Sequence, residues 1–418
     1  MTSFGLLFLA ALLTTAFTRL WLAQRHLAHV VSHRNAVPAP FAADIGLDAH
    51  QRAADYTAAK TRLGRYDILL DAAMAALLTF GGGLQALHDA AATLFEAGLA
   101  RELALLVLVM IVLTVVELPV SVYRTFVVEQ RFGFNKTTPR LFVADFVKNL
   151  AVGALFGLPL AACILWLMER SGGLWWLYAW LVWVAFNAFL LAIYPTWIAP
   201  LFNKFSPLDD ASLRERVERL LDRCGFKVKG LMVMDGSRRS SHGNAYFTGF
   251  GKTKRIVFFD TLLARLEPAE VEAVLAHELG HFRLKHVAKR MVWIFGASLA
   301  LLWILAQLMT EPWFYAGLNV ATPSTAMALV LFFVIAPSFS FLTQPLFAAY
   351  SRKHEFEADA YAASQADARE LGSALLKLYE DNASTLTPDP VFVGFYYSHP
   401  PASQRLARLG ITGLERAA

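Results

Sequence analysis

Seven long apolar runs constrain this chain more than any other feature of its sequence. A helix that crosses the ~30 Å hydrocarbon core of a bilayer needs about 20 mostly apolar residues. Windows of that length cover residues 4–23, 67–88, 103–123, 148–168, 174–197, 289–309 and 325–349. The composition agrees, because 56% of the residues are hydrophobic and 17% are charged, against about 45–50% and about 25% in soluble domains. We therefore predict a mostly α, polytopic membrane protein with seven transmembrane helices.

Two of the windows carry residues that are unusual in a membrane span. Arg19 lies near the end of the first window, and the second contains Asp71 and the glycine run 81–83. The first window lacks a basic leader and is followed by Arg25, which favours a retained membrane anchor over a cleaved signal peptide.

The positions of Lys and Arg predict how the spans are oriented, since basic residues are enriched in cytoplasmic loops. The loops after the first and third windows carry Arg25, Arg34, Arg52, Lys60, Arg62, Arg65, Arg124, Arg131, Lys136 and Arg140. The N-terminus is therefore expected outside, whereas the insert 198–288 and the tail 350–418 are expected in the cytoplasm. The formal charge of +5 then reflects loops that face anionic lipid, rather than a nucleic-acid partner.

This topology divides the chain into four parts. The parts are membrane helices one to five over 1–197, the insert 198–288, membrane helices six and seven over 289–349, and the C-terminal region 350–418.

The two cysteines indicate no structural role. Cys163 lies in an apolar run and Cys224 in a polar stretch, so neither a disulfide framework nor a cysteine-rich metal site is predicted.

The insert has the pattern of a small α+β unit that leads into a helix with a marked start. Pro268, followed by Glu270 and Glu272, is typical of a helix N-terminus, where the helix dipole favours acidic side chains. The other expected elements are a helix over 211–224, strands over 231–234 and 255–259, and a polar turn over 235–243.

That helix carries the sequence His277-Glu278-Leu279-Gly280-His281, an HExxH motif. Positions i and i+4 share one helix face, so both imidazoles can reach one zinc ion while Glu278 faces the water that the ion activates. Two histidines also fall at this spacing by chance in a chain that has 11 of them. The motif alone therefore leaves both a catalytic site and an accident open.

A catalytic zinc site has three protein ligands and one open position, so a third ligand must lie elsewhere in the chain. The segment 351–359 follows the last span and contains Glu355 and Asp359, which share a helix face, whereas Glu357 points the other way. We predict that Glu355 is the third ligand and that Asp359 is the carboxylate that orients a ligand histidine. Taken alone, this segment also fits a solvated, charged face at a helix end.

Three further side chains near these motifs are weaker candidates. His354 and Glu357 are conceivable substitute ligands, although their positions face away from the predicted site. His286 lies off the metal-facing stripe of the HExxH helix and is expected to be a surface or interfacial histidine.

With these motifs, the chain resembles the CAAX prenyl protease 1 family of seven-span zinc metalloproteases over nearly its whole length. The stretches that carry the resemblance are EQRFGFNKT (129–137), PLFNKFSPL (200–208), SHGNAYFTG (241–249), HELGHF (277–282), SRKHEFEADA (351–360) and His399-Pro400-Pro401 with Arg405. The resemblance implies an integral-membrane zinc metalloendopeptidase with one Zn²⁺ per chain.

The resemblance also implies a barrel of seven helices around a large water-filled chamber, capped by a cytoplasmic zinc domain. Asp71, Glu117 and Asn187 would then line the chamber, since ionisable side chains in a bilayer are costly unless they face water or partners. Hydrogen bonding between helices accounts for these three residues equally well.

For the substrate, the resemblance implies an edge to which a peptide adds as an extended strand. His399 would donate to the oxyanion of the tetrahedral intermediate, and the segment that carries it would be held in place by the arginine that follows. Without the resemblance, Asn244 reads as a turn residue and His399 as a buried histidine before a rigid proline pair. The residues implied in substrate binding are Asn244, Ala245, Tyr246, Phe247 and Arg405.

In the expected reaction, Glu278 takes a proton from the zinc-activated water and passes it to the leaving amine. In the family this removes the last three residues of a prenylated CAAX sequence, and some members act on other peptides. The compact loops and short tail look bacterial, which predicts a multi-pass protein of the bacterial inner membrane and makes an unprenylated peptide or protein an alternative substrate.

Two other functions fit the same motifs. An HtpX-like membrane quality-control zinc protease shares HExxH and a later Glu-containing helix, although seven spans and the GFNKT and HPP stretches count against it. A transporter or scaffold with a relict metal site belongs to a different class. Glu278 argues against that class, because a pure metal-binding site needs no base beside its ligands.

Overall fold

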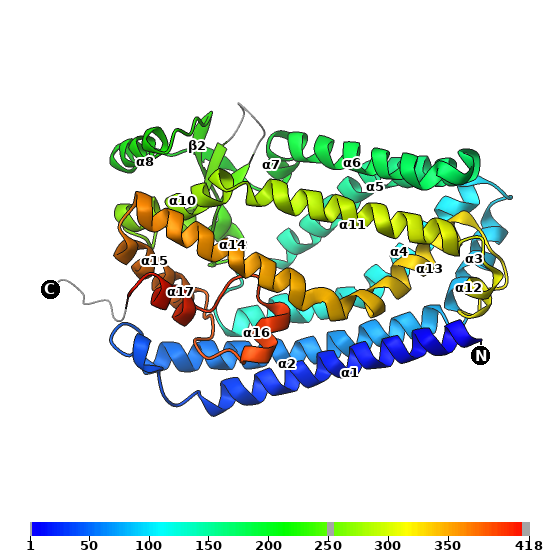
Figure 1. The fold of residues 1–418 in the computed structure, drawn as a ribbon, viewed down its shortest axis with the longest axis horizontal. Helices are drawn as coiled ribbons and strands as arrows, with labels where there is room; N and C mark the ends of the chain where they lie inside the picture. Colours follow the sequence, from blue (N-terminus) through cyan, green and yellow to red (C-terminus); the bar gives the residue numbers. More distant parts are fainter. Residues whose placement is uncertain (1, 249–254, 412–418) are drawn as a thin grey trace.

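Residues 2–248 and 255–411 are described by a computed structural model, in which long helices lie side by side (Figure 1). In the described residues, six helices are long and apolar enough to cross a membrane, and one bent pair of helices adds a seventh span. The predicted mostly α, polytopic architecture is thereby confirmed. The long helices are α1 (Ser3–Ser32), α2 (Leu47–Leu78), α4 (Leu99–Tyr123), α5 (Pro139–Arg170), α6 (Trp175–Ile193), α11 (His286–Leu308) and α13 (Thr325–Ser340), which α14 (Gln344–Gln365) continues.

The bent pair forms the second span, and its bend lies in the glycine run. α2 begins at Leu47 and ends at Leu78, and α3 (Gly83–Leu94) leaves it at 59°. Gly82, between the two helices, has a φ of +73°, which side-chain-bearing residues rarely adopt. The predicted window, 67–88, lies within this bent pair, whose first helix starts earlier than the window and whose break lies where glycine permits the turn.

A polar domain lies at the end of the bundle opposite the start of α1 (Figure 1). Its four-stranded sheet has the order β1-β2-β4-β3, with β2 and β4 parallel and the outer pairs antiparallel. The predicted helix over 211–224 and strands over 231–234 and 255–259 agree within one residue, whereas β1 is too short to show an alternating pattern. The elements are β1 (Phe205–Pro207), α8 (Ala211–Arg223), β2 (Gly230–Met234), β3 (Ala245–Thr248), β4 (Arg255–Phe259) and α10 (Pro268–Arg283).

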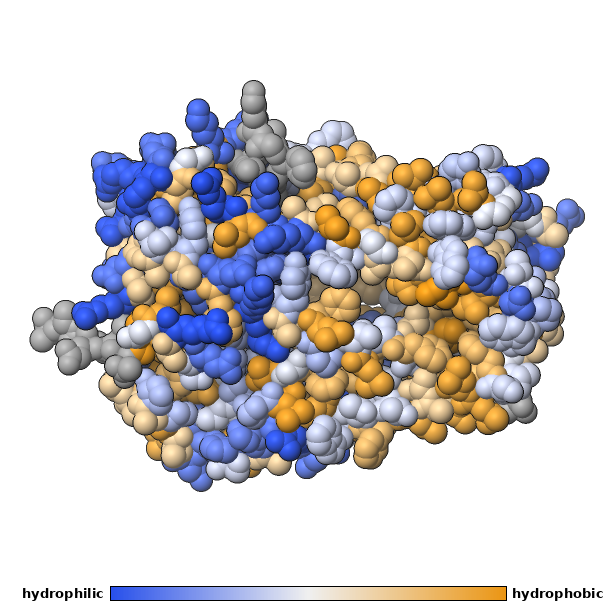
Figure 2. All heavy atoms as spheres, in the orientation of Figure 1, coloured by the Kyte–Doolittle hydropathy of each residue, from blue (hydrophilic) through white to orange (hydrophobic). Residues whose placement is uncertain are grey.

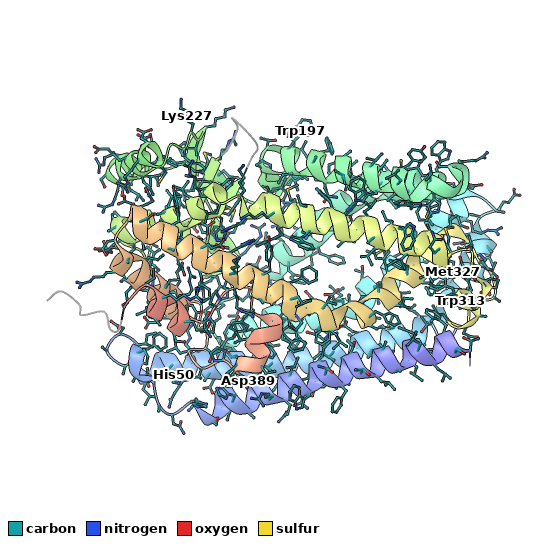
Figure 3. All side chains as sticks on the ribbon, in the orientation of Figure 1. His50, Trp197, Lys227, Trp313, Met327 and Asp389 are labelled. Carbon is teal, nitrogen blue, oxygen red and sulfur yellow. The ribbon has the colours of Figure 1, made fainter. Side chains whose placement is uncertain are left out.

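The C-terminal helices fold back over both the polar domain and the bundle. α15 (Ala368–Asp381) packs against α10, α16 (Pro390–Tyr396) packs against α14 and α1, and α17 (Ala402–Arg408) packs against α15. Asp389, labelled in Figure 3, caps the start of α16 and accepts a hydrogen bond from Arg25 Nε at 2.9 Å. The tail is thus tied to the first span.

The outward surface of the long helices is apolar. Figure 2 shows hydrophobic side chains gathered over the helical bundle, and hydrophilic ones over the end that carries the polar domain. Large apolar side chains such as Phe17, Trp197, Val292 and Trp293 are exposed. Extensive exposed apolar surface is typical of a face that meets lipid.

The helices surround a cavity of about 1720 Å³, whose mostly apolar wall is formed by α1, α2, α4, α5 and α13. Asp71 and Glu117 lie on this wall, as predicted for a chamber, and Asp71 pairs with Arg19 at 3.0 Å. Asn187 is not among the residues that line this cavity, and its side-chain amide donates to the carbonyl oxygen of Trp183 in its own helix.

Candidate metal centre

A firmly capped start fixes the position of α10. Glu267 and Glu270 form a capping box, in which the side chain of Glu270 accepts from the backbone N–H of Glu267 at 2.8 Å. Pro268 occupies the first turn, as the sequence predicts. Glu270 is buried and also accepts from Ser373 and from Lys377 Nζ at 2.8 Å. The helix start is thereby joined to α15.

Gly280 lets α10 approach α14 closely. A Cβ at this position would lie 3.0 Å from Ala358 Cα and 3.1 Å from the Ala358 carbonyl oxygen, which is tighter than an ordinary contact of ~3.5–4.0 Å. Ala358 is itself fully buried. The helix with the HExxH motif and the helix that carries Glu355 therefore lie in direct contact.

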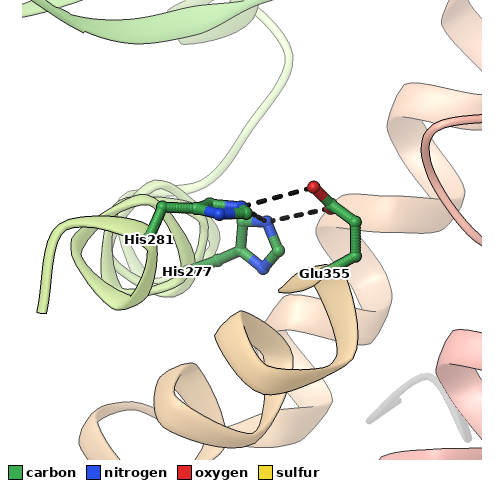
Figure 4. A group of neighbouring side chains, drawn as sticks. All are labelled: His277, His281 and Glu355. Carbon is green, nitrogen blue, oxygen red and sulfur yellow. Dashed lines mark hydrogen bonds and ion pairs between the residues drawn. The ribbon is translucent and has the colours of Figure 1, made fainter. Parts of the chain in front are cut away.

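His277, His281 and Glu355 converge at this contact (Figure 4). The two histidine Nε2 atoms are 3.2 Å apart, Glu355 Oε2 lies 3.4 Å from His277 Nε2, and Glu355 Oε1 lies 3.4 Å from His281 Nε2. A tetrahedron with metal–ligand bonds of ~2.0–2.1 Å has edges of ~3.3–3.4 Å. Each of the three separations is close to this edge length, and one ligand atom from each residue lies within 4.8 Å of the other two, so the group can hold one metal ion.

The environment of Glu355 also fits a cation. Its side chain is 4% exposed, and its Oε2 atom has no hydrogen-bond partner within the described part of the chain. A buried carboxylate without a compensating partner costs several kcal/mol. A divalent metal held by this oxygen and the two imidazoles would remove that cost.

A buried ion pair orients His277. Its Nδ1 atom lies 2.8 Å from Asp359 Oδ1, and Asp359 Oδ2 accepts from Arg405 Nε at 2.8 Å. Arg405 has only donors, and a ligand histidine whose Nε2 faces the metal carries its proton on Nδ1, so Asp359 accepts from both. Asp359 thus lies where an orienting carboxylate is expected. Arg405 anchors α17, and with it the preceding segment 399–401, to this pair.

Glu278 and His399 are the two other predicted site residues beside the metal ligands. Glu278 is partly buried, and this burial raises the pKa of its carboxyl group, in the direction that suits a general base. His399 Nε2 lies 3.5 Å from Glu355 Oε1, and its side chain is 65% exposed, in a pocket of about 590 Å³. The alternative reading of His399 as a buried histidine was therefore wrong.

β3 lies at an outer edge of the sheet and next to α10. The ring of Phe247 packs on that of Phe282, with centroids 4.7 Å apart, and Tyr246 pairs with β4 in the ladder. Asn244 is exposed, and its Oδ1 atom accepts from the backbone N–H of Ala245 at 2.8 Å. An unpaired sheet edge is a template for an added strand, so the placement of these residues fits a bound peptide.

Two stretches singled out in the sequence meet beside β3. The backbone N–H of Ser241 donates to the carbonyl oxygen of Phe134 at 3.2 Å, and that of Lys136 donates to the carbonyl oxygen of Arg239 at 3.0 Å. Arg239 also forms an ion pair with Asp145 at 2.8 Å. The loop after α4 and the start of α5 are thus fixed to the turn that precedes β3. The last residue of the stretch 241–249, Gly249, lies outside the described residues.

His286 is a site residue that sequence reasoning misplaced. It is 1% exposed, its Nδ1 atom lies 3.0 Å from His281 Nδ1, and its Nε2 atom lies 2.9 Å from Glu357 Oε2. The predicted surface or interfacial position was wrong, because Lys285 adopts a φ of +56° and turns the chain so that the start of α11 faces α10. The sequence carries no signal for this contact, since the two histidines do not share one helix.

The chain is similar to known proteins over most of its length. Residues 26–204 match the family described as CAAX prenyl protease N-terminal, five membrane helices, and residues 207–411 match peptidase family M48. A CAAX prenyl protease 1 homolog of Arabidopsis thaliana is 38% identical over 70% of this chain and 69% of its own length. CAAX prenyl protease 1 of Saccharomyces cerevisiae is 35% identical over 74% and 72%. The crystal structure of S. mikatae Ste24p matches with a TM-score of 0.91 at 29% identity, covering 98% of this chain and 99% of that one.

Proposed function

Because this chain belongs to the CAAX prenyl protease 1 family of M48 peptidases, we propose that it removes the C-terminal tripeptide from prenylated CAAX proteins. It is an integral-membrane zinc metalloprotease of that family. The observation that carries the proposal is the convergence, beside Glu278, of His277, His281 and the buried carboxylate of Glu355, whose Oε2 atom has no hydrogen-bond partner in the described residues.

In this proposal, His277, His281 and Glu355 hold one zinc ion per chain. When bound, the metal supplies Lewis acidity that activates water and polarises the scissile carbonyl. Asp359 keeps the Nε2 atom of His277 directed at the metal by accepting the Nδ1 proton, and Arg405 balances the charge of Asp359. The donor set of two imidazoles and one carboxylate is typical of a catalytic zinc site.

Glu278 moves the proton, and His399 stabilises the developing negative charge. Glu278 accepts the proton of the attacking water and delivers it to the amine that leaves, which the raised pKa of its carboxyl group favours. His399 donates a hydrogen bond to the oxyanion that forms at the carbonyl carbon. The separation of 3.5 Å between His399 Nε2 and the oxygen of Glu355 supports this role.

The substrate binds, in this proposal, as a strand added to β3 along Asn244–Phe247. The space around the site suits a substrate that has both a peptide and a lipid part. The pocket beside His399 adjoins the apolar cavity of the bundle, because both are lined by Arg19, Asp67, Ile68 and Tyr396. A prenyl chain is apolar enough to occupy such a cavity, whereas an unprenylated peptide would leave it to water or lipid.

We further propose that the catalytic side faces the cytoplasm and that the N-terminus lies outside, on the strength of the Lys and Arg distribution. The division into parts 1–197, 198–288, 289–349 and 350–418 follows from the same topology. A bacterial inner-membrane location is proposed from the compact loops, and the relatives compared above are eukaryotic.

The test of the proposed chemistry is Glu278→Gln, which keeps the size of the side chain and removes the proton acceptor. We expect unchanged zinc content and a fall of at least ~10²–10⁴-fold in the cleavage rate of a farnesylated CAAX peptide. Glu218→Gln, exposed on α8, is the control and should cleave like the wild type. The enzyme assignment fails if the Glu278→Gln variant cleaves as fast as the wild type, and the prenyl specificity fails if the wild type cleaves only plain peptides.

A further inference from the structure

A second cluster of potential ligands lies directly behind the metal centre. Atoms of His286, His354 and Glu357 lie within 4.8 Å of one another, and both histidines are buried. None of these residues has a role in the function proposed above. The cluster lies between α10, α11 and α14. It could either bind a second metal ion or hold the ligands of the first metal ion in position.

The geometry of the two rings speaks against a second metal site. The imidazoles of His286 and His354 are stacked, with centroids 4.0 Å apart and planes at 6°. A metal binds an imidazole nitrogen along its lone pair, in the plane of the ring, at ~2.0–2.1 Å. Two nearly parallel planes at this spacing share no such point, so one ion cannot be bound well by both rings.

The hydrogen bonds instead form a chain whose proton positions are all determined. His281 must leave Nε2 unprotonated to bind a metal, so its proton lies on Nδ1 and is donated to His286 Nδ1, 3.0 Å away. Because His286 accepts at Nδ1, its own proton lies on Nε2. That proton is donated to Glu357 Oε2, 2.9 Å away, and the carboxylate can only accept.

We propose that His286 and Glu357 are positioning residues that hold His281 in the tautomer and orientation that a metal requires. The two ligand histidines are then supported in different ways: His277 by a carboxylate directly, and His281 through a second imidazole. This inference rests on the metal centre proposed above.

The backbone fixes this arrangement independently of the side chains. Lys285 has a φ of +56°, a region that is uncommon for residues other than glycine, and the turn places His286 at the first position of α11. Glu357 lies on α14, two residues from the predicted ligand Glu355. The relay therefore joins α10, the start of the sixth span and α14 at a single point.

The experiment compares His286→Phe with His354→Phe, which exchange neighbouring stacked rings for the same apolar ring. Zinc affinity is measured on the purified full chain by competition with a chelator, and the absorption spectrum of the cobalt-substituted protein reports ligand geometry. We expect His286→Phe to lose ~10–100-fold in zinc affinity and to alter the cobalt spectrum. His354→Phe should match the wild type in both.

Glu357 is a second position to test, and its substitution disturbs the packing less, because its side chain is 36% exposed. Glu357→Gln keeps an oxygen that accepts from His286 and should retain most of the affinity, whereas Glu357→Leu should lose affinity in the manner of His286→Phe. Equal losses in the Gln and Leu variants would overturn the relay.

Three other outcomes are decisive. If His286→Phe binds zinc as tightly as the wild type, or if His354→Phe loses as much, the cluster acts by packing and the relay is refuted. A second equivalent of zinc that disappears in His354→Phe would also overturn it, in favour of a second metal site. If the wild type binds no zinc at all, the proposed metal centre fails with it.

Discussion

Replacing Gly280 by alanine tests whether the contact between α10 and α14 sets the geometry of the site. The added methyl carbon would lie 3.0 Å from Ala358 Cα, where ~3.5–4.0 Å is ordinary, so the helices must part by a few tenths of an ångström. His277 and His281 move with α10 and Glu355 with α14. The gaps of 3.4 Å between the histidines and Glu355 would then widen by a similar amount, beyond the ~3.3–3.4 Å edge of a zinc tetrahedron.

The variant should remain folded while it loses activity and zinc affinity. Overpacking lowers the free energy of unfolding by ~1–3 kcal/mol. Replacing glycine by alanine inside a helix raises it by ~1 kcal/mol, because alanine has the higher helix propensity. The free energy of unfolding should therefore fall by only ~0–2 kcal/mol. A displacement of ~1 Å in a catalytic site can cost ~10²-fold in rate, so a shift of a few tenths of an ångström should cost ~3–10-fold in peptide cleavage, with weaker zinc binding.

Gly296→Ala is the matched control for this prediction. Gly296 also lies inside a helix, α11, but an added Cβ there meets nothing within 4 Å. Both variants are assayed for zinc retention against a chelator, for cleavage of a farnesylated CAAX peptide and for thermal unfolding. If Gly280→Ala binds zinc and cleaves like Gly296→Ala, the close approach of the two helices does not set the site, and the reasoning is wrong.

Two further predictions concern the tail and the topology. Arg405→Met removes one partner of a buried ion pair and leaves Asp359 uncompensated, so the free energy of unfolding should fall by ~3–5 kcal/mol, measured by thermal denaturation in detergent; a change below ~1 kcal/mol would contradict a buried pair. Once the native cysteines are replaced, an impermeant thiol reagent on intact cells should label a cysteine at the exposed position Thr322 but not one at the exposed position Glu218, and the reverse pattern would overturn the orientation.

The membrane spans could be predicted because each one is determined by the composition of its own segment. A run long enough to span the bilayer is recognised from its own composition, whatever the rest of the chain does. α2 shows the limit of this rule. Its first half is polar in sequence but carries buried residues such as Ala53 and Tyr56, which pack against other protein segments rather than lipid. A hydropathy window has no means of detecting such packing.

The predicted ligands came from local helix geometry, whereas their supports depend on tertiary structure. His277 and His281 are one turn apart, as are Glu355 and Asp359, and either spacing can be read from the sequence. The contact of Arg405 with Asp359 requires the tail to return across two intervening helices. No local pattern encodes that return.

The placement of the metal centre has a consequence for biosynthesis. α10 is made before the hairpin of the last two spans and α14 after it, so the histidines leave the ribosome well ahead of Glu355. The donors cannot meet until both spans have entered the bilayer and α14 has folded back beside α10. A nascent or misinserted chain is therefore unable to assemble its metal centre. The protease becomes active only after membrane insertion is complete.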